Sequence, residues 1–198
     1  MIFDYPEPRT ARRHGPYGYS RYESYRPWLR DEFTFRCIYC LKRERWGQVT
    51  AEYELDHFQP QTLHPDLELS YDNLVYACRR CNNVKRAQAV DDPFAVATSG
   101  HLKVLGSGEL LAISGDAIRL VRVLDLNAEI MIQWREMWLR IAELAEENDP
   151  VLYRNLFRFP EDIPRLDRLI PTGGNARPDG VVQSWFARQE RDELPESY

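Results

Sequence analysis

Apolar residues recur at helical or strand spacing along the chain, and the first such pattern predicts a helix over residues 21–34. Ser20 is a suitable N-cap for this helix, and Pro27 indicates a break or a late start. The apolar positions are Tyr22, Tyr25, Trp28, Leu29 and Phe33. Residues 1–20 show no period and predict an irregular arm. Arg12-Arg13-His14 in that arm is expected to pack on the domain as a strap, or alternatively to reach along a nucleic-acid backbone.

Patterns in the middle of the chain predict two strands and a helix. Residues 50–58 alternate between apolar and polar positions, so they predict a strand that includes Val49 at its start. Residues 60–69 have no period and predict a loop, whereas 70–78 predict a second short strand or a turn. A helix is expected from Cys81 to about Ala89.

The next region predicts a β-hairpin and a helix. Residues 102–105 and 110–113 flank Gly106-Ser107-Gly108, which is typical of a hairpin turn. Ser114 can start a helix over 117–124.

The longest predicted helix covers about residues 128–147, with Asn127 as its cap and Asp149-Pro150 as its stop. Its apolar stripe should be core or a subunit contact rather than a cofactor site. The stripe comprises Ile130, Trp134, Trp138, Ile141 and Ala145, flanked by Met131, Met137 and Leu144. Residues 151–198 are interrupted by Pro and Gly, and short helices are expected at 162–169 and 180–193.

These elements together predict an α+β protein in four sections. They are an N-terminal arm and helix (1–35), a central core (36–90), a hairpin with helices packing on that core (91–150), and an irregular, partly helical extension (151–198).

Length and composition indicate how large a core the chain can bury and in which compartment it is expected. A chain of 198 residues, 43% hydrophobic and 29% charged, can bury a core as one domain with extensions. No apolar run approaches the roughly 18–20 residues that span a bilayer, so no membrane association is expected. The first residues lack a signal-peptide pattern, which favours the cytoplasm.

The net charge of −5 is not that of a bulk nucleic-acid binder, but the charge is unevenly distributed. Residues 9–45 hold ten Arg or Lys against four acids. A second basic cluster comprises Arg79, Arg80, Lys85 and Arg86. A local basic face of this kind can bind phosphates although the whole chain is acidic.

The four cysteines form two pairs, Cys37-x-x-Cys40 and Cys78-x-x-Cys81. Two such turns present four thiolates to one ion, and Zn²⁺ prefers a tetrahedron of this type. A redox role would not require a second matching pair, so a closed, structural Zn²⁺ site is expected. The 37 residues between Cys40 and Cys78 leave room for an inserted hairpin.

Polar residues between and after these pairs predict a second site of different chemistry. Asp56 and Asn82 offer hard oxygen ligands that suit Mg²⁺ or Mn²⁺, and His57 can activate water. With nearby cationic side chains, this set indicates phosphodiester hydrolysis. Asn83 competes with Asn82 as a ligand, but successive helical side chains point about 100° apart, so one of them should face the metal. Glu54 either orients this site or is an exposed strand acid.

Four sequence elements in this order resemble the HNH endonucleases, in the subgroup with a four-cysteine zinc site and a ββα-metal fold. They are Cys37-x-x-Cys40, Glu54-Leu55-Asp56-His57-Phe58-x-Pro60, Asp72-Asn73-Leu74 and Cys78-Arg79-Arg80-Cys81-Asn82-x-x-Lys85. The resemblance covers about residues 36–90, a quarter of the chain.

The resemblance implies a role for each matching residue. His57 would be the general base, and Asp56 and Asn82 would hold one divalent ion. Asn73 would brace the loop between the strands, and Lys85 would face phosphate or stabilise the helix. The substrate would be DNA, cut to 5′-phosphate and 3′-hydroxyl ends. Asn82 stands where the family often has His, which leaves the preferred metal open.

We therefore expect a metal-dependent DNA endonuclease. One alternative is a zinc-stabilised module that binds nucleic acid or a partner without catalysis. The other is a nuclease effector, of the phage-defence or restriction type, that cuts only with a partner. A homodimer or a partner encoded in the same operon is compatible with each of these interpretations.

Overall fold

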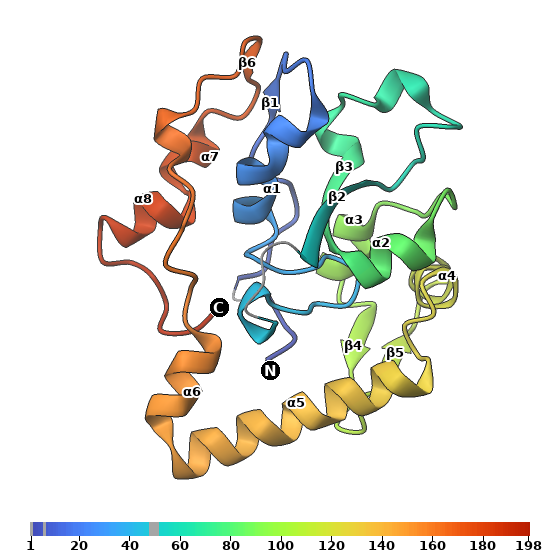
Figure 1. The fold of residues 1–198 in the computed structure, drawn as a ribbon, viewed down its shortest axis with the longest axis vertical. Helices are drawn as coiled ribbons and strands as arrows, with labels where there is room; N and C mark the ends of the chain where they lie inside the picture. Colours follow the sequence, from blue (N-terminus) through green and yellow to red (C-terminus); the bar gives the residue numbers. More distant parts are fainter. Residues whose placement is uncertain (1, 6, 48–51) are drawn as a thin grey trace.

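The computed structural model describes residues 2–5, 7–47 and 52–198, and these residues form a mixed α+β fold (Figure 1). Its strands form three two-stranded antiparallel sheets within the described residues. The predicted α+β class is confirmed at this level. No helix in the described ranges is long and apolar enough to cross a membrane.

The central unit is a hairpin followed directly by a helix. Strand β2 (Tyr53–His57) pairs antiparallel with β3 (Leu74–Cys78), and α2 (Arg79–Lys85) begins at the next residue. Both predicted strands are confirmed, although the start expected at Val49 and Thr50 lies outside the described residues. The helix starts two residues earlier than predicted, at Arg79, and ends earlier, at Lys85. All five residues of β3 are buried, so this strand lies in the core.

The segment before this unit contains a 3₁₀ turn, η1 (Tyr22–Tyr25), and helix α1 (Arg26–Glu32). The late start indicated by Pro27 is confirmed, because this residue lies in the first turn of α1. Ser20 is not the cap: Arg21 occupies that position and makes no side-chain cap hydrogen bond.

The N-terminal arm packs against both α1 and the C-terminal extension, as expected for a strap. Strand β1 (Pro16–Tyr17) pairs antiparallel with β6 (Gly174–Asn175). His14 is fully buried, and its Nε2 lies 2.7 Å from Asp31 Oδ1. The backbone N–H of Trp185 donates to the other oxygen of Asp31 at 2.8 Å. A single carboxylate on α1 therefore joins the two ends of the chain.

The region after the hairpin unit matches the prediction except for one added helix. Helix α3 (Pro93–Thr98), capped by Asp92, was not predicted. The hairpin β4 (Leu102–Val104) and β5 (Leu110–Ala112) and helix α4 (Gly115–Val123) are confirmed. The Ser114 side chain caps α4 by accepting from the Ala117 N–H at 3.2 Å.

Helix α5 (Glu129–Asn148) runs along one edge of the molecule (Figure 1). Asn127 does not cap it, because its side chain bonds both the N–H and the C=O of Leu110 at 2.9 Å. The buried Arg135 guanidinium donates to the backbone carbonyl of Gly108 at the hairpin tip. The stripe was predicted to be core or a subunit contact. Met131 and Ala145 are buried in the core, whereas Ile130, Met137 and Leu144 are exposed and do not belong to it.

The C-terminal part contains short elements joined by loops. Helix α6 (Pro150–Phe157) follows α5 at once, since Asp149 caps it by accepting from the Leu152 N–H. This helix was not predicted. The helix expected at 162–169 is a single 3₁₀ turn, η6 (Leu166–Arg168). The helix expected at 180–193 is two short helices, α7 (Asp179–Val182) and α8 (Trp185–Gln189). Three further 3₁₀ turns are η2 (Glu44–Trp46), η4 (Pro65–Leu67) and η5 (Tyr71–Asn73).

Candidate functional site

The four cysteines converge on one buried point. Their sulfur atoms all lie within 4.8 Å of one another, and Cys40 Sγ is 3.7 Å from Cys78 Sγ. A tetrahedron with Zn–S bonds of about 2.3 Å has sulfur–sulfur edges of about 3.8 Å, so the geometry fits one Zn²⁺ ion. None of the four cysteines forms a disulfide.

The first pair lies in a tight turn of the kind expected. The N–H groups of Leu41 and Cys37 donate to the carbonyls of Cys37 and Lys42, each at 2.9 Å. Burial raises the pKa of the Cys37 thiol well above its usual value, and hydrogen bonds with Cys40 and Cys78 raise it further. Four thiolates this close need a cation to offset their repulsion and desolvation, which a bound Zn²⁺ supplies.

Asp56 is held on both oxygens inside the core. The Tyr39 hydroxyl donates to Oδ2 at 2.6 Å, and the Lys85 ammonium donates to Oδ1 at 3.0 Å. Lys85 is fully buried and also donates to the carbonyl of His57 at 2.7 Å. Burial raises the pKa of Asp56, although Lys85 and the Tyr39 hydrogen bond oppose that shift. Tyr39, which lies between the first two cysteines, was not predicted to take part.

His57 is fixed in one orientation by a backbone carbonyl. Its Nε2 lies 2.9 Å from the carbonyl oxygen of Glu68, and its ring meets that of Tyr22 edge-on with centroids 4.9 Å apart. Because a carbonyl oxygen only accepts, this contact requires a proton on Nε2, and Nδ1 is then the acceptor nitrogen of the neutral form of the ring. This orientation leaves Nδ1 able to take a proton from water.

Asn82 is oriented by Glu54. The Asn82 Nδ2 donates to Glu54 Oε2 at 2.7 Å, and Arg79 Nε donates to Oε1 of the same carboxylate at 3.1 Å. A carboxylate only accepts, so the amide nitrogen of Asn82 must face it and the amide oxygen points elsewhere. Glu54 is therefore a polar neighbour of the site rather than an isolated surface acid.

These contacts explain the spacing of the motif. Glu54 and Asp56 are two residues apart on β2 and so lie on one face of the strand. Asn82 and Lys85 are three residues apart on α2 and so share one side of the helix. The pairs meet in order, Glu54 with Asn82 and Asp56 with Lys85.

Asn73 joins the two ends of the loop between the strands. Its Oδ1 accepts from the Gln59 N–H and its Nδ2 donates to the Gln59 carbonyl, both at 3.0 Å. Such contacts are consistent with the loop-bracing role that the resemblance to HNH endonucleases implies for Asn73.

The basic cluster named from the sequence does not form one surface. Arg80 donates to the backbone carbonyls of Leu124 and Asp125 at 2.8 and 3.0 Å. The ammonium of Lys85 is buried, so it does not face solvent. Arg79 and Arg86 are exposed beside α2. Sequence patterns reveal the charges of this cluster but not these internal partners.

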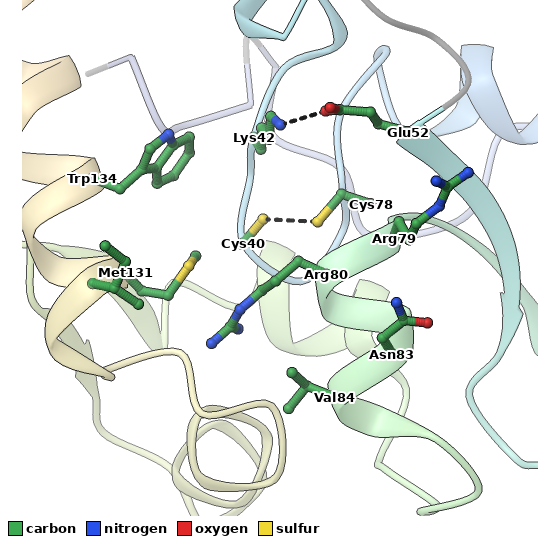
Figure 2. A pocket seen from close by; sticks show the side chains of 11 residues that line it. Cys40, Lys42, Glu52, Cys78, Arg79, Arg80, Asn83, Val84, Met131 and Trp134 are labelled. Atoms are coloured by element: carbon green, nitrogen blue, oxygen red, sulfur yellow. Dashed lines mark hydrogen bonds and ion pairs between the residues drawn. The ribbon is translucent and has the colours of Figure 1, made fainter.

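A cavity of about 660 Å³ lies between α5 and α2, next to the four-cysteine cluster. Figure 2 shows Trp134 and Met131 on the α5 side and Arg80, Asn83 and Val84 on the α2 side. Cys40 and Cys78 also line it, between these two sides. The residues that line this cavity do not include Glu54, Asp56, His57 or Asn82, so the cavity is distinct from the site around His57.

Comparison with known proteins assigns the central segment. Residues 37–88 match the HNH endonuclease family, so this segment is an HNH endonuclease domain. The chain is also similar to the Septu protein PtuB of Bacillus thuringiensis, with 28% identity over 74 residues. The aligned segment covers 35% of this chain and 28% of that relative, so the likeness concerns a part of each protein.

Proposed function

We propose that this chain is a metal-dependent endonuclease that hydrolyses DNA phosphodiester bonds at a ββα-metal site. The observation that carries the proposal is the orientation of His57, whose Nε2 is fixed on the Glu68 carbonyl so that Nδ1 can act as a base. This histidine ends β2, beside Asp56 and the start of the loop braced by Asn73.

The side chains of Asp56 and Asn82 carry the oxygen donors that a hard divalent cation prefers. Asp56 and Asn82 would hold one Mg²⁺ or Mn²⁺ ion through oxygen atoms, with Glu54 orienting the amide. Each carboxylate oxygen has a second lone pair, so Asp56 can bind a cation while it accepts from Tyr39 and Lys85. When bound, the ion supplies positive charge to the scissile phosphate and the leaving oxygen.

In the proposed reaction, His57 Nδ1 takes a proton from a water molecule as the water oxygen attacks phosphorus. The bond from phosphorus to the 3′ oxygen breaks, and that oxygen takes up a proton from solvent water to become the 3′-hydroxyl. The other product keeps a 5′-phosphate, and His57 then returns its proton to solvent. Arg79 and Arg86 are both exposed and would contact the flanking backbone phosphates. The Zn²⁺ held by the four cysteines has no open position, so its role is structural.

The test is cleavage of supercoiled plasmid by the full, zinc-loaded chain with Mg²⁺ or Mn²⁺. His57→Ala should lower the rate by a factor of about 10² to 10⁴, the usual contribution of a general base. His101→Ala is the matched control, because His101 is an exposed histidine outside the HNH domain, and it should cut like the wild type.

Other results would favour the alternatives. DNA that is retarded on a gel but not cut with any divalent ion would identify a binding module. Cutting that begins only when the product of a neighbouring gene is added would identify a partner-dependent effector.

A further inference from the structure

Large exposed apolar side chains are concentrated outside the HNH domain. Of the fourteen found among the described residues, nine lie between Leu105 and Leu152 and two lie within residues 37–88. The most regular of them are on α5: Ile130, Met137 and Leu144 are 68%, 50% and 50% exposed and recur every seven residues.

The three side chains belong to one continuous apolar stripe, which we call the α5 stripe. The partly buried Trp134 and Ile141 lie between them, so the spacing alternates between four and three residues. This is the spacing by which one helix packs against another, and it extends over about 21 Å. The neighbouring Met131, Ala142 and Ala145 are buried, so the α5 stripe is additional to the face that packs on the core.

An acidic row runs beside the α5 stripe. Glu129, Glu136 and Glu143 each precede one of the three exposed apolar residues and are themselves exposed. The exposed charged residues of α5 are Arg140 and five glutamates, namely Glu129, Glu136, Glu143, Glu146 and Glu147. The face is therefore apolar and strongly negative.

This charge selects among the molecules that could cover the α5 stripe. DNA and anionic membrane surfaces are repelled by the row of glutamates. A second copy of α5 brings five more exposed glutamates against one arginine, and an antiparallel pair places both acidic rows on the same side. A helix with Lys or Arg beside its own apolar positions complements both the apolar α5 stripe and the row of glutamates.

We propose that the α5 stripe binds an amphipathic, basic helix of a partner protein, by packing of a helix along an apolar face. The stripe starts at Ile130, which also lines the cavity between α5 and α2. A large apolar side chain near one end of the partner helix can enter that cavity and anchor the complex.

The test uses two synthetic helical peptides with the same leucines at alternating four- and three-residue spacing, one flanked by lysines and the other by glutamates. Binding to the full, zinc-loaded chain is measured by fluorescence anisotropy of the labelled peptide. The wild type should bind the lysine peptide, and the triple variant Ile130→Ser, Met137→Ser, Leu144→Ser should bind it at least about tenfold more weakly.

The matched control is Ile170→Ser with Val182→Ser, because these apolar residues are 90% and 63% exposed and lie outside α5. This control should bind the lysine peptide like the wild type, and circular dichroism should show that both variants stay folded. Glu136→Gln with Glu143→Gln should weaken binding and reduce its dependence on salt.

Three results would overturn the proposal. They are no binding of the lysine peptide by the wild type, equal binding of the two peptides, and equal binding by the wild type and the triple variant. A wild-type dimer in sedimentation velocity that the triple variant loses would also overturn it, because a second copy would then cover the stripe.

Discussion

At the scale of single residues, the two acids of β2, Glu54 and Asp56, contact different residues of α2 and so have different roles. Asp56 lies in the core between Tyr39 and Lys85, so it ties the zinc turn, the strand and the helix together. Glu54 lies nearer the solvent and fixes the amide of Asn82. The sequence alone could not assign these tasks, because the spacing of Glu54 and Asp56 puts both on one face without showing which partner each meets.

Glu54 is accordingly expected to govern how well Asn82 binds a divalent ion. In Glu54→Ala the Asn82 amide can rotate, so about tenfold more Mg²⁺ should be needed for half-maximal cleavage, the usual scale for loss of a group that orients a metal ligand. The rate at saturating Mg²⁺ should change less. Binding of Mn²⁺, followed by electron paramagnetic resonance, should weaken in parallel and needs no cleavage.

Glu52→Ala is the control for this prediction, because Glu52 pairs with Lys42 at 2.8 Å and does not contact Asn82. An unchanged Mn²⁺ affinity in Glu54→Ala would show that Glu54 does not orient the ligand.

At the scale of elements, local patterns predicted the strands and helices best where one face is regularly apolar. α4 and α5 have such faces, whereas β3 is apolar throughout. α3 and α6 each begin at a proline, which is favourable in a first helical turn. α6 was missed because Pro150 was interpreted only as the stop of the preceding helix. Asn127 was assigned to a cap because its hydrogen bonds to Leu110, 17 residues away, leave no local sequence signal.

The four-cysteine cluster joins the turn before β2 to the junction of β3 and α2. If the cluster holds Zn²⁺ as expected, removal of the ion should loosen all three elements together. Zinc binding in small finger domains is worth roughly 10–16 kcal/mol. Even about 3 kcal/mol of this would lower the Tm by about 6–12 °C in a domain of this size. The measurement is calorimetry before and after chelation, with metal analysis expected to give one zinc per chain.

If Zn²⁺ restores the Tm and Mg²⁺ does not, the lost stability came from the cysteine cluster and not from the proposed Mg²⁺ site at Asp56 and Asn82. A Tm that chelation leaves unchanged would contradict the structural role of the cluster.

At the scale of the whole molecule, α1 connects the two ends of the chain through adjacent buried acids. Asp31 accepts from His14 and Trp185, and Glu32 accepts from Arg9 and from the backbone N–H groups of Arg13 and His14. In Figure 1 the N-terminal arm and the orange-to-red C-terminal segment lie on either side of α1. No local sequence pattern reveals this arrangement, because His14 and Asp31 come into contact only when the arm packs against α1.

Glu32 makes this junction sensitive to acid. Burial by itself raises the pKa of Glu32, but the charges of Arg9 and His14 and the two backbone hydrogen bonds outweigh it, so the pKa is lowered below 4.5. A carboxyl group with a lowered pKa in the folded state stabilises the fold fully above its unfolded pKa. This contribution is lost as the pH falls from about 4.5 through the folded pKa, because the unfolded state then binds more protons.

The free energy of unfolding, measured with urea between pH 7 and pH 3, should therefore fall steeply below about pH 4.5. Glu32→Gln should lower the free energy of unfolding by about 3 kcal/mol or more at pH 7, because it leaves buried cations without their partner. In this variant the free energy of unfolding should fall less steeply below about pH 4.5. Glu196→Gln, at an exposed position, should leave both unchanged. If Glu32→Gln lost stability below about pH 4.5 as steeply as the wild type, other carboxyl groups would cause that loss. The junction around α1 would then not limit stability in acid.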